Sequence, residues 1–190
     1  RQVDLVVWPE NAADLNPLDY PRAAGVLDFV TEELNAPLVV GTITSDEIGR
    51  VFNSLLLWQP GEGAVAQYDK IHPVPFAEYL PDREFWYPLA PSLFDLVPRD
   101  YSFGERPNVF DIELAPGGTS SRERVLAGLA ICFDIVDDAL LHQMVDGGAE
   151  IEISTRGRSG RLQGRLLRSR LGGAETAGVS RLERRRHETS

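Results

Sequence analysis

Hydrophobic residues along this chain cluster in short runs, and the spacing of the runs predicts alternating strands and helices. Apolar or alternating runs of roughly four to eight residues, separated by Gly, Pro, Asn and Asp, are typical of strands buried in a sheet. The runs that fit this pattern are 3–8, 36–44, 52–59, 64–70, 108–114, 124–132 and 149–155. The turn sequence PGEG at 60–63 predicts that the third and fourth runs form an antiparallel hairpin.

Two further segments have the period of an amphipathic helix. Apolar residues in 20–35 recur every three or four positions, with acidic residues on the opposite side. The stripe expected to face the core is Ala23, Val26, Leu27, Val30 and Leu34. A second helix is predicted over 135–148 and closed by Gly147. This order of strands and helices predicts an α/β domain with mixed sheets.

The composition is that of a globular protein with one core. Of the 190 residues, 43% are hydrophobic and 25% are charged, which argues against wholesale disorder. The single cysteine, Cys132, excludes an internal disulfide framework and a multi-cysteine metal site. No apolar run approaches the ~18 residues that a spanning helix needs. The chain opens on RQVDLVVWPE, without Met or a signal sequence, so we expect a fragment truncated at its N-terminus.

Charge divides the chain into two parts. Residues 151–190 hold ten Arg and four Glu and no aromatic residue, whereas residues 1–150 hold nine basic and twenty-five acidic side chains. We therefore predict one domain over 1–155 and an Arg-rich tail over 156–190. We expect this tail to be solvated and disordered in preference to a basic arm for nucleic acid or anionic lipid. Its Arg, Gly, Ser and Leu content also suggests the hypothesis of a frameshifted C-terminus.

Three polar residues follow predicted strands and are candidates for chemistry, although each has a structural interpretation. Cys132 is either a small buried hydrophobic residue or a nucleophile whose thiolate a following helix stabilises. Glu10 in WPEN is, on its own, expected to be a helix N-cap or a turn carboxylate on the surface. Lys70 is the only lysine beside eighteen arginines, which indicates that arginine cannot replace it there.

Other signals are weaker or absent. Glu78 lies in a long aromatic and acidic loop, 71–91, and loops of this length on compact domains are usually functional. The three histidines, His72, His142 and His187, lack the spacing of metal ligands. Serine-hydrolase, phosphate-loop and dinucleotide fingerprints do not occur in the sequence.

Three ordered segments, DLVVWPENA, YDKIHPVPFAEYLP and GLAICFDI, resemble the active-site motifs of the carbon–nitrogen hydrolase (nitrilase) superfamily. Within it, WPENA, the pattern around Lys70 and the segment FGERPNVFDIELAPGG are most similar to the apolipoprotein N-acyltransferase branch. The resemblance covers about residues 3–152 and implies that 1–155 form a partial catalytic domain. It implies an α-β-β-α sandwich and a triad in which Glu10 is the general base, Lys70 stabilises the oxyanion and Cys132 is the nucleophile.

The resemblance also implies supporting residues and a reaction. Glu78 matches a further glutamate of that branch, the Phe133 N–H would complete the oxyanion site, and Trp8 and Tyr79 lie in the same motifs. The implied reaction moves an acyl chain from a phospholipid to Cys132 and then to the N-terminal amine of a diacylglyceryl lipoprotein. It needs no cofactor or metal. The implied location is the extracytoplasmic side of the bacterial inner membrane, in a membrane-embedded parent protein without a role for nucleic acid.

Two alternatives stay open. A soluble, cytoplasmic amidase or nitrilase would share the triad but let water resolve the thioester, and an inactive fragment or binding module would use none of it.

The sequence also departs from the family pattern. The expected first strand and membrane helices are missing before residue 1, and no Asn-containing strand end follows GGAEI. Phe133 and Asp134 stand where family members often have an aromatic residue and Glu. Aromatic residues of 76–87 are expected to form part of a lid over the lipid.

Overall fold

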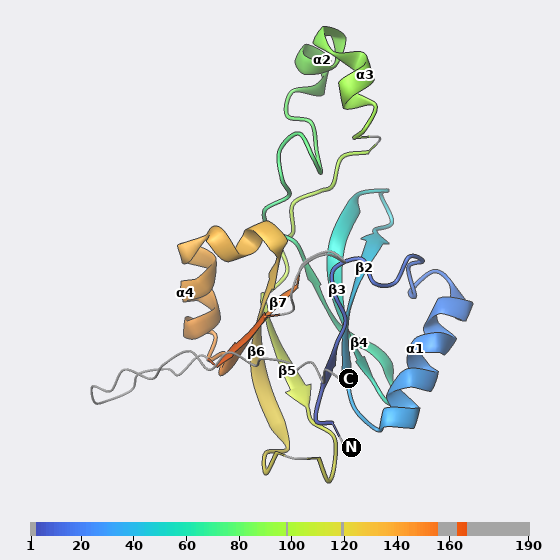
Figure 1. The fold of residues 1–190 in the computed structure, drawn as a ribbon, viewed down its shortest axis with the longest axis vertical. Helices are drawn as coiled ribbons and strands as arrows, with labels where there is room; N and C mark the ends of the chain where they lie inside the picture. Colours follow the sequence, from blue (N-terminus) through green and yellow to red (C-terminus); the bar gives the residue numbers. More distant parts are fainter. Residues whose placement is uncertain (1–2, 98, 119, 156–162, 167–190) are drawn as a thin grey trace, which may run out of the picture.

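Two four-stranded mixed sheets form the centre of the molecule. The computed structural model describes residues 3–97, 99–118, 120–155 and 163–166 (Figure 1). The first sheet has the order β1-β2-β3-β4, and β1 is parallel to β2 while the other pairs are antiparallel. Its strands are β1 (Val6–Val7), β2 (Leu38–Ser45), β3 (Val51–Gln59) and β4 (Gly63–Asp69).

The second sheet has the order β5-β6-β7-β8, and here β6 and β7 are the parallel pair. Its strands are β5 (Val109–Glu113), β6 (Arg124–Ile131), β7 (Ile151–Thr155) and β8 (Gln163–Leu166). The predicted α/β fold with mixed sheets is therefore confirmed. The strand β8 lies within the segment predicted as a tail, and 156–162 and 167–190 lie outside the described residues, so the tail and frameshift hypotheses stay predictions.

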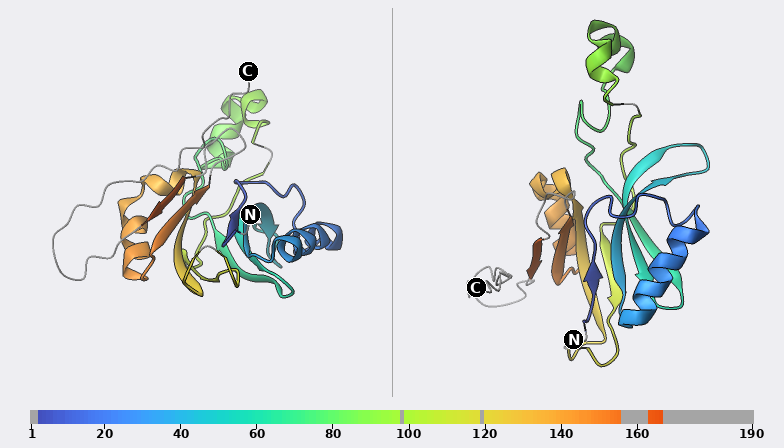
Figure 2. Two further views of the ribbon diagram at one scale, coloured as in Figure 1. Left: turned by 60° about the horizontal axis from the view of Figure 1, so that its bottom comes forward. Right: turned by 45° about the vertical axis from the view of Figure 1, so that its right-hand side comes forward.

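The two sheets face each other, with one long helix on each outer face (Figure 2). Leu55 and Leu57 of β3 point between the sheets, toward residues such as Leu129 of β6. The intervening residues of β3, Leu56 and Trp58, pack on the other face against the helix α1. Because both faces of these strands are covered, their sequences are continuous apolar runs instead of alternating ones.

The helix α1 (Pro21–Leu34) begins with Pro, whose fixed φ suits a first helical position, and ends at Asn35 in the left-handed conformation. Leu27 and Thr31 are its buried residues. The predicted stripe was wrong for Val26 and Leu34, which are 55% and 42% exposed. The helix contacts the sheet along a narrow line of residues spaced i, i+4. The hydroxyl of Thr31 donates a hydrogen bond to the carbonyl of Leu27, which allows a polar residue to be buried at a position where an apolar one was expected.

The helix α4 (Asp138–Asp146) covers the second sheet through Leu140 and Met144, which pack against Ala130. It is shorter than the predicted 135–148, because a 3₁₀ helix, η2 (Cys132–Val136), precedes it and Asp137 caps its N-terminus. The predicted strand 124–132 ends one residue early, since Cys132 already belongs to η2. The predicted strand 3–8 is likewise shorter in the structure.

The long loop after β4 projects beyond the sheets (Figure 1). It contains short helices that the sequence did not predict: α2 (Arg83–Trp86), the 3₁₀ helix η1 (Tyr87–Leu89) and α3 (Pro91–Phe94). We call residues 76–103 the extension. Within the described ranges, no helix combines the length and the apolar character needed to cross a bilayer.

Candidate active site

Three charged side chains from distant parts of the sequence meet at the end of the first sheet. The ammonium of Lys70, which is 1% exposed, lies 2.6 Å from Oε2 of Glu78 and 3.9 Å from Oε1 of Glu10. Glu10 is 8% exposed. Burying an ammonium is costly unless opposite charge lies beside it, and the carboxylates of Glu10 and Glu78 supply that charge. This arrangement fixes a positive charge at a defined point.

Asn53 of β3 connects the two carboxylates. Its Nδ2 donates to Oε1 of Glu10 at 2.6 Å and to Oε1 of Glu78 at 3.3 Å. Its backbone carbonyl accepts a hydrogen bond from the backbone N–H of Lys70 at 2.8 Å. Asn53 therefore contacts all three charged residues.

Backbone packing determines where Lys70 and Glu10 lie. The carbonyl of Lys70 accepts a hydrogen bond from the N–H of Gly104, and a Cβ on Gly104 would lie only 2.0 Å from the carbonyl oxygen of Asp69. Gly41 of β2 has the same role for Glu10, since a Cβ there would lie 2.5 Å from the carbonyl oxygen of Pro9 and 2.7 Å from Cα of Glu10. Both positions need glycine because a backbone segment passes directly over them.

Glu78 lies in a tight turn after β4. Its backbone N–H donates to the carbonyl of Val74 at 2.8 Å, and its Oε2 accepts from the N–H of Val74 at 2.7 Å. Phe76 within this turn has a φ of 63°, in the left-handed region. The carboxylate is therefore held by backbone as well as by Lys70, which limits the positions that it can adopt.

Cys132 is the first residue after β6 and is half-buried against the core between the sheets. Its φ of 49° is left-handed, a conformation that costs a residue other than Gly about 1–2 kcal/mol. Such a backbone persists where the surroundings impose it, and this is common at reactive sites. The expected following helix is the short η2.

Asp134 connects the turn that contains Cys132 with the segment that contains Lys70. This carboxylate is 0% exposed and accepts hydrogen bonds from the Tyr68 hydroxyl and the His72 N–H, both at 2.8 Å, and from the Ile131 N–H at 3.1 Å. Tyr68 and His72 flank Lys70 in the sequence. The ends of β4 and β6, which belong to different sheets, are thus joined through one side chain.

Burial, followed by the nearby Asp134 carboxylate, raises the pKa of Tyr68 well above its ordinary value, so Tyr68 remains a donor. A second contact joins the same two segments, between Nε2 of His72 and Oδ2 of Asp137 at 2.6 Å. The hydrogen bond from His72 is the main cause that lowers the pKa of Asp137, and the backbone N–H of Ala139 adds to it. These ties keep the two strand ends in a fixed relation.

The remaining predicted site residues have different surroundings. Trp8 packs against the cluster between α1 and the first sheet. Tyr79 makes an edge-to-face contact with Phe103, with ring centroids 5.1 Å apart. The Phe133 side chain is 45% exposed beside Cys132. The structure thus brings Glu10, Lys70 and Glu78 together and connects the Cys132 turn to them, whereas the catalytic roles of these residues stay predictions.

Sequence reasoning missed Asn53 and Tyr68 and treated Asp134 only as a deviation from a pattern. A signal for Asn53 was present, because Asn and Ser interrupt an otherwise apolar strand at FNSLLLW. Asp134 gave no such signal, since an acidic residue after a strand is ordinary on a surface. Across the described ranges, no group of three or more His, Cys, Asp or Glu side chains is placed to hold a metal ion.

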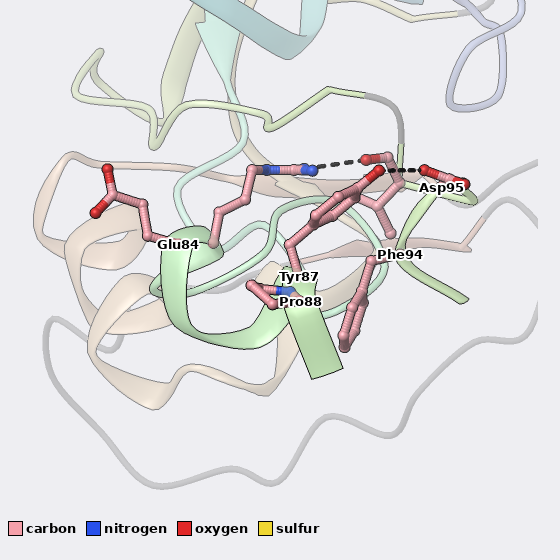
Figure 3. Close-up of a pocket in the computed structure, with 7 residues that line it drawn as sticks. Glu84, Tyr87, Pro88, Phe94 and Asp95 are labelled. Atoms are coloured by element: carbon pink, nitrogen blue, oxygen red, sulfur yellow. Dashed lines mark hydrogen bonds between the residues drawn. The ribbon is translucent and has the colours of Figure 1, made fainter. Parts of the chain in front are cut away.

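A pocket of about 730 Å³ lies in the extension instead of beside the buried charges (Figure 3). Tyr87 donates from its hydroxyl to Oδ1 of Asp95 at 2.7 Å, and Arg83 donates to the carbonyl of Val97. The full lining is Arg83, Glu84, Tyr87, Pro88, Phe94, Asp95 and Val97. The pocket is therefore a feature of the extension itself.

Apolipoprotein N-acyltransferases are among the curated proteins to which this chain is similar. The chain matches the apolipoprotein N-acyltransferase of Mycolicibacterium smegmatis at 27% identity over 155 residues, which cover 77% of this chain and 24% of the relative. It matches the corresponding enzyme of Geobacter metallireducens at 29% identity over 154 residues, covering 80% of this chain and 27% of the relative. The chain thus spans about a quarter of the length of these curated relatives.

Among solved structures, an amidase from Nesterenkonia sp. superposes with a TM-score of 0.53 and 14% identity, covering 80% of this chain and 51% of the amidase. At that identity the likeness concerns the fold. The family model for carbon-nitrogen hydrolase matches residues 1–172, which is most of the chain and extends past residue 155. The chain belongs to the carbon–nitrogen hydrolase (nitrilase) superfamily.

Proposed function

We propose that this chain carries the catalytic centre of an N-acyltransferase that works through a thioester on Cys132. The observation that supports the proposal most is the buried Lys70 between Glu10 and Glu78, joined through Asp134 to the turn of Cys132. A carboxylate, an ammonium and a thiol are the groups that acyl transfer by a cysteine requires.

The unequal distances around Lys70 suggest how the two carboxylates divide their roles. Glu78 forms a close ion pair with the ammonium of Lys70 at 2.6 Å, whereas Glu10 lies 3.9 Å from the same ammonium and interacts with it more weakly. Glu10 is then the group that accepts the thiol proton of Cys132. Lys70, held in place by Glu78, donates to the oxyanion together with the Phe133 N–H. Losing one oxyanion donor typically costs about 10²–10³ in rate.

Each half of the reaction exchanges one bond for another. The sulfur of Cys132 attacks the ester carbonyl of a phospholipid and gives its proton to Glu10. The ester C–O bond then breaks and Glu10 returns the proton to the leaving oxygen. In the second half a primary amine attacks the thioester, an amide bond forms, and the C–S bond breaks. The amine loses one proton through Glu10 and Cys132 recovers one.

The proposed substrates are a phospholipid acyl donor and the N-terminal amine of a diacylglyceryl lipoprotein. They rest on the similarity to apolipoprotein N-acyltransferases. With them we propose residues 1–155 as the catalytic unit, a membrane-embedded parent protein, and a position on the extracytoplasmic side of the bacterial inner membrane. Sequencing the gene on both sides of this segment tests the parent protein and the frameshift hypothesis together.

The extension supports a lipid substrate. Phe85 and Trp86 are 63% and 36% exposed, and their rings pack edge to face with centroids 5.2 Å apart. Apolar side chains that stay exposed on a projection are suited to contact an acyl chain. We propose that they form part of a lid over the donor. Replacing both by Ser is expected to reduce transfer from long-chain donors while short-chain esters still react, and unchanged use of long-chain donors would reject the lid.

A second candidate is an amidase that hydrolyses a carbon–nitrogen bond, and the fold of the Nesterenkonia amidase favours it. Water would then resolve the thioester. The two candidates differ in product. In the presence of phospholipid and a diacylglyceryl peptide, the transferase yields an acylated peptide, whereas the amidase yields ammonia from a primary amide and leaves the peptide unmodified.

Intact-mass spectrometry after incubation with phospholipid vesicles tests the first half of the proposed acyl transfer. We expect an acyl adduct on Cys132 that hydroxylamine removes, and none on Cys132→Ala, while the surface variant His142→Ala behaves like the unmodified protein. Acrylamide forms a Michael adduct with the active-site cysteine in a mutant of the Nesterenkonia sp. AN1 amidase, and we choose it as the thiol probe for Cys132. Labelling of Cys132 no faster than free cysteine would reject both candidates in favour of an inactive fragment.

A further inference from the structure

The amide of Asn53 occupies a special position between the charged groups of the site. Its residue is 2% exposed, and its Nδ2 donates one hydrogen bond to Glu10 and one to Glu78. An amide nitrogen carries two protons, so this donor is fully used. Its Oδ1 has no hydrogen-bond partner within the described residues. Turning the amide over would place an oxygen against two carboxylates, which fixes the orientation.

The charges alone would not maintain this arrangement. Two carboxylates and one ammonium leave a net charge of −1 in a buried site, and the carboxylates repel each other wherever Lys70 does not lie between them. A neutral group that donates to both offsets this repulsion without neutralising Lys70. The same residue also holds the backbone N–H of Lys70, at 2.8 Å from its own carbonyl oxygen.

We propose that Asn53 is a positioning residue that sets the spacing of Glu10 and Glu78 around Lys70. This inference rests on the proposed function, because the spacing matters for acyl transfer only if these groups act on Cys132. Asn53 touches neither the substrate nor the thiol in this scheme. It keeps Glu10 at a distance from the ammonium at which it can accept a proton.

The informative variant is Asn53→Asp, which has the same shape but replaces the donor with a third carboxylate. Repulsion among three carboxylates requires a higher pH before all are ionised. The acidic limb of the pH profile, for kcat/KM and for alkylation of Cys132, is expected to move up by about one pH unit or more. A variant that only loosened the fold would lower the rate without moving this limb.

Rescue by a second substitution separates charge from shape. Asn53→Asp combined with Glu78→Gln again contains one amide and two carboxylates. We expect the midpoint of urea denaturation of Asn53→Asp to fall more at pH 8 than at pH 5, and the double variant to recover roughly half of that fall or more. The matched control is Asn108→Asp, because Asn108 is also buried but donates to a carbonyl, that of Leu140. The loss of stability caused by Asn108→Asp should not be recovered when Glu78→Gln is added.

The denaturation cycle needs only a folded chain, so it is independent of the proposed function. An equal loss at both pH values, or no recovery in the double variant, would overturn the positioning role. If the cycle shows coupling but Cys132 reacts no faster than free cysteine, the acyltransferase proposal fails and the positioning of the carboxylates stands.

Discussion

Replacing Asp134 with Asn tests the connection between the two strand ends most directly. The side chain keeps its shape, but one of its oxygens becomes an NH₂ group that faces hydrogen-bond donors. If the NH₂ group faces His72, the backbone N–H of His72 loses its acceptor. If it faces Tyr68 and Ile131 instead, the tyrosine hydroxyl can turn and accept, but the Ile131 N–H is left unpaired.

Either orientation leaves at least one buried backbone donor without a partner, at a cost of about 1–3 kcal/mol. The remaining bonds change from charged to neutral, and hydrogen bonds to charged groups contribute about 1.5–3 kcal/mol against about 1 for neutral ones. Since Asp134 is fully buried, solvent offers no replacement. We therefore expect a loss of about 2–4 kcal/mol, a large part of the ~5–15 kcal/mol that stabilises a typical domain.

Urea denaturation followed by tryptophan fluorescence measures this loss, and alkylation of Cys132 measures its consequence for the site. The turn of Cys132 would shift relative to Lys70, and a displacement of about 1 Å can reduce a rate by about 10²-fold. Labelling should therefore slow by at least about tenfold. A loss of stability below ~0.5 kcal/mol, as for an ordinary surface substitution, would refute the reasoning.

Four other substitutions follow from the packing and the buried charges. Gly41→Ala should lower the free energy of unfolding by about 1–3 kcal/mol and slow alkylation of Cys132, because its Cβ would overlap the segment of Glu10. Gly25→Ala has no atom within 4 Å of the added Cβ, so it should instead stabilise α1 by about 0.5–1 kcal/mol in the same urea titration. The raised pKa of Tyr68 contributes to the free energy of unfolding, and this contribution is fully present below pH ~10 and is lost as the pH rises above it. The free energy of unfolding of Tyr68→Phe should therefore fall less between pH ~9 and ~11 than that of the unmodified protein. Lys70→Arg should abolish acyl transfer and destabilise the fold, since a planar guanidinium does not fit the buried position of an ammonium; acyl-adduct formation at a near-normal rate would contradict this.

The elements that the sequence predicted correctly are those with a strong local pattern. The hairpin of β3 and β4 followed from apolar runs around PGEG, and its register is set by the same alternation that directs Leu55 inward and Leu56 outward. The helix α1 was expected over 20–35, but its buried face was not. Which side of a helix is covered depends on how it lies on the sheet, and spacing in one segment does not contain that information.

The extension shows a different limit. Its helices α2 and α3 have four residues each, too few for a periodic pattern, and α3 begins at a Pro. The candidate site shows a third limit. Glu10, Lys70 and Glu78 were singled out in the sequence, but the amide of Asn53 and the carboxylate of Asp134 act across 43 and 62 residues of sequence separation. Contacts of this kind follow from topology, which local patterns do not specify.

The placement of the site between the two sheets explains why so many of its contacts are buried. Lys70 follows a strand of the first sheet and Cys132 follows a strand of the second, so these two side chains can meet only where the two sheet ends are held together. Apolar packing between the sheets is not directional and permits small sliding movements. The hydrogen bonds of Asp134 have a defined geometry and do not permit them. Apolar burial accordingly stabilises the sandwich, whereas a few buried polar side chains set the relative position of the Cys132 turn and the segment that contains Lys70.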